Sequence, residues 1–344
     1  MTTVIIDAMG GDNAPFEIVK GGLTAAAELG VKVIFAGDEA DIRASAKSAG
    51  MENAAYEVIH TSEVFAMEDD PALISREKSN TSLALGLKAL SEGKGDAFVT
   101  AGSTGALLTG ATLFVKRIKG IRRAALAPII PTAEGGALLI DCGANVDCTP
   151  EYLLQFGVMG GFYAEKVMGR QKARVGLLNI GAEETKGGAL RKDAYKYLKK
   201  AGGEGRINFV GNVEGRDVML GTCDVVVSDG YSGNIMLKTM EGVGIYFSRL
   251  LKGMFYKNIL TKLAALLVKG ELNKIKKLMD YTETGGAPLM GISKPVIKAH
   301  GSSNAKALKN AVRQAVIYHE SGMVNDIMAN IDSMTIAQNA RTEA

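Results

Sequence analysis

Six segments of the chain run from an apolar, strand-like stretch into glycines and small polar residues. The first is VIIDAMGGDNAP, in which Val4–Ile6 lead into Asp7, Gly10, Gly11 and Asp12. The other five are AFVTAGSTGA (97–106), ALLIDCGANVD (137–147), VGLLNIGAEETKGG (175–188), DVVVSDGYSGN (224–234) and PVIKAHGSSN (295–304). Glycine lets backbone N–H groups approach a ligand, and the first turn of a following helix favours negative charge. The repeated pattern predicts a site for an anion such as phosphate, although any one loop alone could be a plain strand-to-helix turn.

Parallel strands would bring the ends of these segments together. Apolar runs alternate with helical periodicity along most of the chain, which predicts a largely parallel sheet covered by helices on both faces, a three-layer α/β/α fold. In such a sheet the loops emerge at the carboxyl edge, where open α/β folds bind their ligands. With 344 residues and 47% hydrophobic content, residues 1–330 are expected to form one large domain, with two lobes as the alternative. Residues 331–344 would be a C-terminal tail.

The loops contain many groups able to bind an anion or to organise a loop. Candidate substrate-binding residues in them are Asp7, Gly10, Gly11, Asp12, Ser103, Thr104, Gly105, Asn145, Ser232, Gly233, His300 and Gly301. Asp7, Asp141 and Asp229 each end or follow a strand. We interpret them as loop organisers rather than bases, because a carboxylate repels phosphate.

Two further residues could act on a reacting group directly. Lys186 follows NIGAEET on a strand-end loop and supplies a cation, unless it is a solvated lysine at a helix start. Asn234 can donate its side-chain amide to a developing oxyanion, or it caps a helix that begins near Ile235.

Signatures of several common chemistries are absent. No G-x-G-x-x-G follows the first strand, and the chain has no G-x-x-x-x-G-K-[ST] and no G-x-S-x-G. The segment GYSGN resembles a nucleophile elbow only superficially, because Asn234 replaces the second glycine and no histidine can be paired with Ser232. A serine nucleophile is therefore not expected.

The cysteines and histidines do not form a metal-ligand pattern. Cys142, Cys148 and Cys223 lack metal-ligand spacing and lie in or near apolar strands, so we expect buried, reduced thiols. The three histidines are too scattered for a metal centre. No metal and no cofactor are expected.

One segment is strongly basic, although the whole chain has a net charge of only +3. Arg249–Lys277 contains eight basic residues and one acidic residue, and we call it the basic island. No nucleic-acid-binding motif accompanies it, so an acidic protein or an anionic lipid surface is the expected partner. The longest aliphatic run, Leu263–Val268, is far shorter than the roughly 20 residues of a spanning helix, and the N-terminus lacks a signal-peptide pattern. A cytoplasmic protein is expected.

The sequence ILTKLAALLVK within the basic island predicts a short helix with lysines on one face and apolar residues over most of the rest. The candidate contact residues are Lys257, Lys262, Leu263, Leu266, Leu267 and Lys269. Such a helix could be buried in the core or form a dimer contact. It could also belong to a protruding helical pair at about 235–282 that dips its tip into an anionic membrane.

The motifs DAMGGD, TAGSTG followed by GALLTG, GANVD, GLLNIG, SDGYSGN, TGGAPLMGI and IKAHGSS extend over residues 1 to about 325. In this order and spacing they resemble the PlsX family of acyl-carrier-protein:phosphate acyltransferases. The resemblance implies a fold similar to that of the phosphotransacetylases and the isocitrate/isopropylmalate dehydrogenases. One departure is Ser103, where many members carry Asn, so the position keeps a hydroxyl but loses the reach of an amide.

The resemblance implies transfer of a long-chain fatty acyl group from acyl carrier protein to inorganic phosphate. The acyl phosphate would serve phospholipid synthesis, through a downstream acyl-phosphate:glycerol-3-phosphate acyltransferase. It also implies catalytic roles for Lys186 and Asn234, and a homodimer bound peripherally to the inner face of the cell membrane. Arg76, Lys78 and Asn80, in ISREKSNTS, would hold phosphate or the carrier arm, or form a solvated surface loop. The acidic carrier protein could instead dock on the basic island.

The implied reaction depends on the positioning of phosphate and thioester more than on an activated side chain. Phosphate is already an anionic nucleophile near neutral pH, and a thioester has a good leaving group, so we expect direct attack by phosphate. Two alternatives remain open. One is a short-chain phosphotransacetylase that uses acyl-CoA, and the other is a non-enzymatic membrane-surface scaffold for lipid synthesis, which would leave the six loops unexplained.

Overall fold

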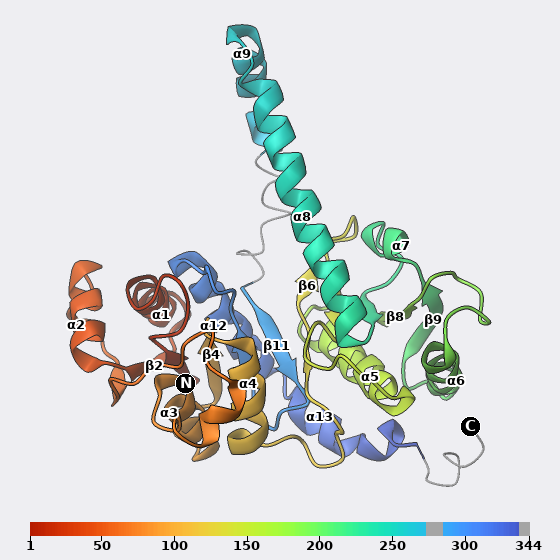
Figure 1. Cartoon of the computed structure of the whole chain (residues 1–344), viewed down its shortest axis with the longest axis horizontal. Coiled ribbons are helices and arrows are strands. Elements are labelled where there is room, and N and C mark those ends of the chain that lie inside the picture. Colours follow the sequence, from red (N-terminus) through yellow and green to blue (C-terminus); the bar gives the residue numbers. More distant parts are fainter. Residues whose placement is uncertain (273–284, 337–344) are drawn as a thin grey trace.

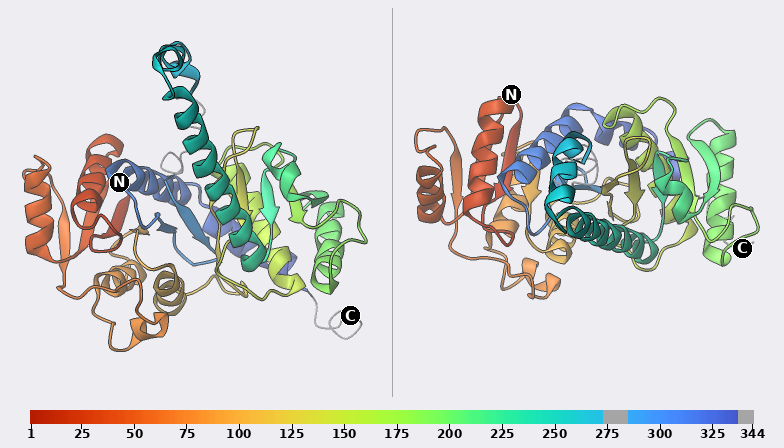
Figure 2. Two further views of the ribbon diagram at one scale, coloured as in Figure 1. Left: turned by 45° about the horizontal axis from the view of Figure 1, so that its top comes forward. Right: turned by 90° about the horizontal axis from the view of Figure 1, so that it is seen from above.

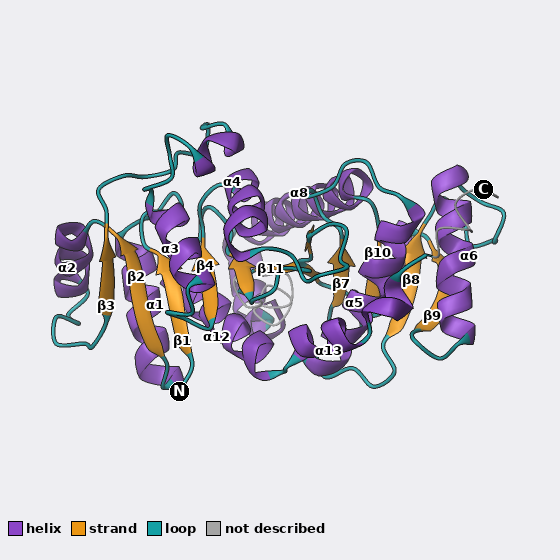
Figure 3. Cartoon of the chain, turned by 90° about the horizontal axis from the view of Figure 1, so that it is seen from below, coloured by secondary structure: helices purple, strands orange, loops and turns teal. Residues whose placement is uncertain are grey.

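The computed structural model describes residues 1–272 and 285–336. They build two sheets that lie beside one another, and helices cover both (Figures 1 and 3). The expected α/β fold is confirmed, but the one sheet predicted from the sequence is two. The reason lies in two short strands, β5 (Ala125–Leu126) and β6 (Ile129–Ile130), which pair antiparallel with different sheets. The ladder of hydrogen bonds therefore ends between them.

The first sheet has the strand order β3-β2-β1-β4-β12-β11-β5. Besides β5, its strands are β1 (Thr3–Asp7), β2 (Lys32–Gly37), β3 (Glu57–His60), β4 (Ala97–Thr100), β11 (Ala287–Met290) and β12 (Val296–Lys298). The five strands β3, β2, β1, β4 and β12 are parallel to one another. Strand β11 runs antiparallel to both β12 and β5. We call this sheet and its helices the first lobe.

Helices cover the two faces of the first sheet because its side chains alternate. In β1, Val4 and Ile6 join the core beneath α1 (Phe16–Leu29), α2 (Glu39–Ser48) and α12 (Ala305–Glu320). Ile5 points to the opposite face, where α3 (Ser82–Ser91) and α4 (Thr104–Gly110) pack. All three side chains are fully buried. A 3₁₀ turn, η1 (Pro71–Ser75), and a π turn, η2 (Ala111–Val115), flank this second face.

The second sheet has the strand order β6-β7-β10-β8-β9. Its parallel strands are β7 (Ala137–Ile140), β8 (Arg174–Leu178), β9 (Asn208–Val213) and β10 (Val225–Val227). On one face lie α5 (Pro150–Lys166) and α6 (Ala189–Gly203), and on the other α7 (Gly215–Met219) and the first turns of α8 (Gly230–Phe255). We call this sheet and its helices the second lobe.

One apolar core runs through both lobes, since buried residues of β1 and of β10 belong to the same cluster. Between α5 and α12, the rings of Tyr163 and Tyr318 meet edge to face with centroids 5.7 Å apart. The Gln314 amide donates to the Tyr163 hydroxyl at 2.8 Å. The chain continues through α13 (Met323–Ala329) into η3 (Ile331–Met334), whose last residue, Met334, is fully buried. The predicted tail therefore does not begin at residue 331, and residues 337–344 lie outside the described part.

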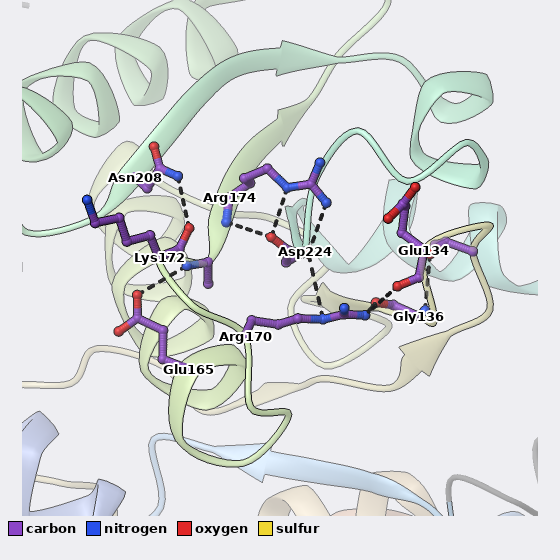
Figure 4. Close-up of polar contacts among 10 residues, drawn as sticks. Glu134, Gly136, Glu165, Arg170, Lys172, Arg174, Asn208 and Asp224 are labelled. Atoms are coloured by element: carbon purple, nitrogen blue, oxygen red, sulfur yellow. Dashed lines mark hydrogen bonds and ion pairs between the residues drawn. The ribbon is translucent and has the colours of Figure 1, made fainter.

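Ion pairs fix the second sheet at the edge where its parallel strands begin (Figure 4). The Asp224 carboxylate, just before β10, accepts from the backbone N–H of Arg174 at 2.9 Å and from its guanidinium at 3.0 and 3.1 Å. Arg170 lies 3.7 Å from the same carboxylate and donates to the carbonyl oxygens of Glu134 and Gly136. Burial opposes the charge of Asp224, but the hydrogen bonds from Arg174 outweigh it and lower the pKa. These contacts stabilise the fold at this edge of the second sheet.

A helical pair protrudes from the second lobe (Figures 1 and 2). The 26-residue α8 continues through a turn into α9 (Ile259–Leu267), whose residues are all unburied. Leu263, Leu266 and Leu267 are 54, 65 and 89% exposed. Of the alternatives for this segment, burial in the core is therefore wrong.

The described part of this protrusion ends at Leu272. Positions 273–282 of the expected range, with Lys274, Lys276 and Lys277 of the basic island, lie outside the described residues. Among the helices that are described, none is both long and apolar enough to span a bilayer.

The packing of α8 on the loop after β7 predicts opposite effects of two alanines in one helix. A Cβ at Gly233 would lie 2.1 Å from the Asp141 carbonyl oxygen, whereas a Cβ at Gly242 would meet nothing within 4 Å. Gly233→Ala should lower the free energy of unfolding by about 1 to 3 kcal/mol. Gly242→Ala should raise it by up to about 1 kcal/mol, because alanine favours helix. Urea unfolding of both variants checks this, and equal effects would contradict the close packing at Gly233.

Candidate active site

The six predicted loops do follow strand ends, three in each sheet. In the first sheet they follow β1, β4 and β12, which are neighbours. In the second they follow β7, β10 and β8, which are also neighbours. Each trio is parallel, so its loops open at one edge of its sheet. The predicted residues thus form two groups rather than one row of six.

Glycines allow the first-lobe loops to interlock. A Cβ at Gly10 would lie 2.4 Å from the Asp7 carboxylate and 2.8 Å from the Gly102 nitrogen. Gly11 has a φ of +107°, and its Cβ would lie 2.8 Å from the Cβ of Ala101. The next residue, Asp12, donates its backbone N–H to the Gly301 carbonyl at 2.8 Å. Gly10 and Gly11 are therefore needed for close approach of the β1 loop to the β4 and β12 loops.

Asp7 is a loop organiser rather than an exposed ligand. Its side chain is buried, and its two oxygens accept from the hydroxyls of Ser82 and Thr100, each at 2.7 Å. Burial raises the pKa of Asp7, while the two hydroxyls act in the opposite direction. The carboxylate joins β1 to β4 and α3, so a direct contact with substrate does not fit its position.

Lys298, at the end of β12, is a buried cation that the sequence analysis did not select. It is 8% exposed, and its ammonium donates to the carbonyl oxygens of Ala101 at 3.1 Å and Ala299 at 2.5 Å. Burial lowers the pKa of Lys298 to about 8, although the charges of Asp7 and Asp12 favour the ammonium form. The available signal was a lysine that ends an otherwise apolar strand, PVIK.

His300 lies on the exposed side of the same loop. Its Nδ1 is 2.8 Å from the Ser302 hydroxyl. Partial burial lowers the pKa of His300, and Glu241 and Lys238 of α8 shift that pKa in opposite directions. Helix α8 starts in the second lobe, and its charged side chains lie close enough to the first-lobe loop to act on His300.

Asp141 organises the loop after β7 in the second lobe. The buried carboxylate accepts from the backbone N–H groups of Leu126, Cys142 and Asn145 at 2.9, 2.7 and 2.6 Å. Burial raises the pKa of Asp141, against these hydrogen bonds. The Asn145 side-chain amide donates to Asp141 and to the Ala124 carbonyl, at 3.0 and 2.8 Å. The amide of Asn145 is thus committed to the loop and does not fit a direct substrate contact.

Asp229 caps α8 and links it to α6. Its carboxylate accepts from the Ser232 backbone N–H at 2.8 Å and from the Ser232 hydroxyl at 3.1 Å, and it pairs with the Arg191 guanidinium. Arg191 also donates to the Ser232 hydroxyl at 2.9 Å. Within the described structure, no histidine is among the hydrogen-bond partners of Ser232.

Asn234 does not cap a helix, because α8 begins at Gly230 with Asp229 as its cap. That alternative is wrong. The Asn234 side chain is exposed and lies beside the β7 loop, where a Cβ at Gly143 would be 3.7 Å from its Cγ. The Asn234 amide is therefore not used to cap the helix, and it lies next to the loop after β7.

Lys186 stands on a stiffened loop between β8 and α6. Its stem lies against Gly181, where an added Cβ would be 3.0 Å from the lysine Cγ. The Asn179 amide donates to the Lys186 carbonyl at 3.1 Å. The ammonium is 4.0 Å from Glu183, and the side chain is 47% exposed. Lys186, on a loop, and Asn234, near the start of α8, therefore follow neighbouring parallel strands, β8 and β10.

The loop ISREKSNTS contributes less free charge than its sequence suggests. Arg76 and Asn80 are exposed, but the Lys78 ammonium pairs with Asp69 at 2.9 Å. The Asn80 carbonyl accepts from the Thr61 hydroxyl at 2.7 Å. Of the two basic residues of this loop, Arg76 is the better placed to meet an anion.

The loop after β4 leads directly into α4. The Ser103 hydroxyl accepts from the Ala106 N–H at 3.4 Å and caps this helix, while Thr104 is exposed. Gly105 packs on η1, where a Cβ would lie 2.7 Å from Pro71. Ser103 therefore has a structural role that does not need the reach of an amide.

The cysteines are protonated and reduced. Cys142 and Cys223 are buried, as expected, while Cys148 is half-buried. Burial raises the pKa of Cys142 and Cys148 to about 12 and that of Cys223 to about 11. Since the thiolate is the nucleophilic form, none of them is activated at neutral pH. Among residues 1–272 and 285–336, no group of three or more acidic, histidine or cysteine side chains could hold a metal ion.

Comparison with known proteins gives a consistent result over nearly the whole chain. The family model described as fatty acid synthesis protein matches residues 2–325. A phosphate acyltransferase from Thermoanaerobacter pseudethanolicus is 48% identical over 330 residues, covering 96% of this chain and 97% of that protein. A phosphate acyltransferase from Oceanobacillus iheyensis is 47% identical over 330 residues, with the same coverage. The resemblance drawn from the sequence motifs is confirmed.

Solved structures support the fold. A phosphotransacetylase from Streptococcus pyogenes superposes with a TM-score of 0.66 at 16% identity, covering 93% of this chain and 94% of that one. The EutD phosphotransacetylase from Staphylococcus aureus gives a TM-score of 0.61 at 15% identity, with the same coverage. The expected similarity to the phosphotransacetylase fold is confirmed.

The buried Lys298 predicts a distinctive dependence of stability on pH. Between pH 8 and 10.5 the unfolded chain keeps the lysine proton while the folded chain has lost it. The free energy of unfolding of the wild type, measured against that of Lys298→Met, should therefore rise by about 2 to 3 kcal/mol across this range. Below pH 8 the difference should be constant. Denaturant unfolding at several pH values checks this, and parallel curves for the two proteins would show that Lys298 titrates normally.

Proposed function

Because the chain belongs to the fatty acid synthesis protein family and is a phosphate acyltransferase, we propose that it transfers a long-chain fatty acyl group from acyl carrier protein to inorganic phosphate. The acyl phosphate would be consumed by an acyl-phosphate:glycerol-3-phosphate acyltransferase in phospholipid synthesis. The observation that carries the proposal is the position of Lys186 and Asn234, which follow the neighbouring parallel strands β8 and β10 and are both exposed.

The proposed reaction is a direct substitution at the thioester. A phosphate oxygen attacks the carbonyl carbon and forms the new C–O bond, and the carbonyl oxygen becomes an oxyanion. Lys186 holds the phosphate charge, and the Asn234 amide donates to the oxyanion. The intermediate then expels the carrier thiolate as the C–S bond breaks. The proton of the attacking hydrogen phosphate ends on the thiol, so no external acid is consumed.

The proposal predicts a specific pair of substrates. Purified protein with palmitoyl acyl carrier protein and phosphate should form palmitoyl phosphate, detected as transfer of label from radioactive phosphate to a lipid product. A chelator should leave the rate unchanged, because the donor set is a lysine and an amide. With phosphate omitted, no acyl label should remain on the protein. Acetyl-CoA as the better donor would favour the short-chain alternative, and no product from either donor would favour the scaffold.

Removing either catalytic donor should slow turnover without unfolding the protein. Both side chains are exposed, so Lys186→Ala and Asn234→Ala leave the core intact. Each should lower kcat by about 100-fold or more, as for a lost transition-state donor. Asn53→Ala, at an exposed turn before β3, serves as a comparison for Asn234→Ala. A folded Lys186→Ala or Asn234→Ala enzyme with a near-normal rate would remove that residue from the mechanism.

The protruding helices α8 and α9 are the basis for proposing a partner and a cellular location. Its exposed apolar side chains, with Lys257, Lys262 and Lys269 nearby, suit both a homodimer contact along α8 and contact of α9 with an anionic lipid surface. We propose a cytoplasmic homodimer that associates peripherally with the inner face of the cell membrane. The same lysines offer acidic acyl carrier protein a docking surface.

Replacing Leu266 and Leu267 by Glu should separate membrane contact from chemistry. The change removes apolar area worth about 1.5 to 3 kcal/mol per leucine and adds charge that anionic lipid repels. The variant should leave anionic liposomes in a flotation assay yet still use soluble acyl carrier substrate. A control with Met219 and Leu220 replaced by Glu changes two adjacent exposed apolar residues of the second lobe body. Liposome binding by the Leu266/Leu267 variant equal to that of the control would exclude α9 as the contact.

A further inference from the structure

A pocket of about 290 Å³ lies at the edge of the second sheet that also carries Lys186 and Asn234. Three segments form it. Val146, Asp147 and Cys148 come from the loop after β7, Leu190 and Arg191 from the first turn of α6, and Asp229, Tyr231 and Ser232 from the start of α8. The Lys186 loop leads directly into α6, and Asn234 lies in the same turn of α8 as Tyr231. The pocket therefore shares its three segments with the proposed catalytic pair.

The charges of this pocket do not suit a phosphate. Arg191 is its one cation, and the guanidinium is paired with the Asp229 carboxylate. Asp147 adds a second carboxylate that is exposed at the rim. The lining carries more negative than positive charge, so an anion would be repelled. The lining therefore favours a group without negative charge.

The remaining groups suit a chain of amides. Arg191 uses one guanidinium nitrogen for Asp229 and Ser232, and its other N–H groups have no hydrogen-bond partner among the described residues. They can donate to carbonyl oxygens, while Asp147 can accept from an amide N–H. Val146, Leu190 and Tyr231 provide apolar walls between these groups. Donors, an acceptor and apolar side chains therefore line the same pocket.

We infer that this pocket takes the pantetheine arm of the acyl donor, an uncharged chain with two amides and a dimethyl group. The inference rests on the proposed function and deepens it, because it assigns the arm to the second lobe and separates it from the phosphate site. An arm held here would lie beside the start of α8, which also carries Asn234. Acyl donors that keep only the thiol end of the arm lose these contacts.

The first experiment fills the pocket. Val146→Trp places an indole at a position that is 62% exposed, so the core is not disturbed. The KM for palmitoyl acyl carrier protein should rise by about tenfold or more, while the KM for phosphate stays within about twofold. With S-palmitoyl-N-acetylcysteamine, which lacks most of the arm, variant and wild type should perform alike. The matched control is Val210→Trp on β9, a valine that is 42% exposed and outside the pocket.

The outcomes separate this inference from the proposed function. A higher KM for phosphate in Val146→Trp would make the pocket an anion site and overturn the inference. Kinetics equal to those of Val210→Trp with every substrate would overturn it as well. If the wild type forms no acyl phosphate from any donor, the proposed function fails, and the pocket is then judged by binding alone.

Binding can be read without turnover because the chain contains no tryptophan. Tyr231→Trp places a single indole at the pocket, and Tyr246→Trp places one further along α8, at a position equally exposed at 61%. Titration with pantetheine should change the emission of the Tyr231→Trp protein to saturation and leave that of Tyr246→Trp unchanged. Emission that does not respond in either protein, or responds equally in both, would overturn the inference.

Discussion

Buried aspartate carboxylates at strand ends hold the loops of the candidate site in place. An ionised carboxylate loses its hydration when it is buried, so it is stable there only when several donors surround it. Asp7 at the end of β1 receives two hydroxyls, Asp141 after β7 receives backbone N–H groups, and Asp229 caps α8. Each carboxylate also has a donor that is distant in the sequence, Thr100 for Asp7, Leu126 for Asp141 and Arg191 for Asp229, so each joins separate segments of the chain. The glycines beside them allow the approach that these short hydrogen bonds require.

Because these carboxylates are occupied in holding the loops, other groups must act on the substrates. Asp7 and Asp141 are committed to the loops, and burial keeps the cysteines in the thiol form. Lys186 remains exposed on a loop that the Asn179 side chain holds, and Asn234 remains exposed near the start of α8. A site of this kind works by positioning and charge stabilisation, which is what a reaction between phosphate and a thioester needs. The rigidity of the loops is therefore part of the proposed function.

The α8 helix connects the site to the protruding surface. Its first turn rests on the loop after β7, where Gly230 and Gly233 leave no room for a side chain. Further along, Glu241 and Lys238 act on His300 of the first lobe. The helix then leaves the body of the molecule and leads to α9 (Figure 2). A partner or lipid that fixes the outer end of α8 would also restrain the turn that carries Asn234.

The sequence by itself determined the features that are local in the chain. Strand-to-loop patterns, the glycines and the apolar, basic segment around Leu263–Val268 are read from neighbouring residues, and the motifs identified the family. Only the tertiary structure decided that the loops divide between two sheets, that Lys298 is buried, and that the Asn145 amide is occupied by Asp141 and Ala124. It also brought Arg191 to Asp229 across 38 positions of the chain. Burial and hydrogen-bond partners depend on which distant segments pack together, and a local pattern of side chains does not specify that packing.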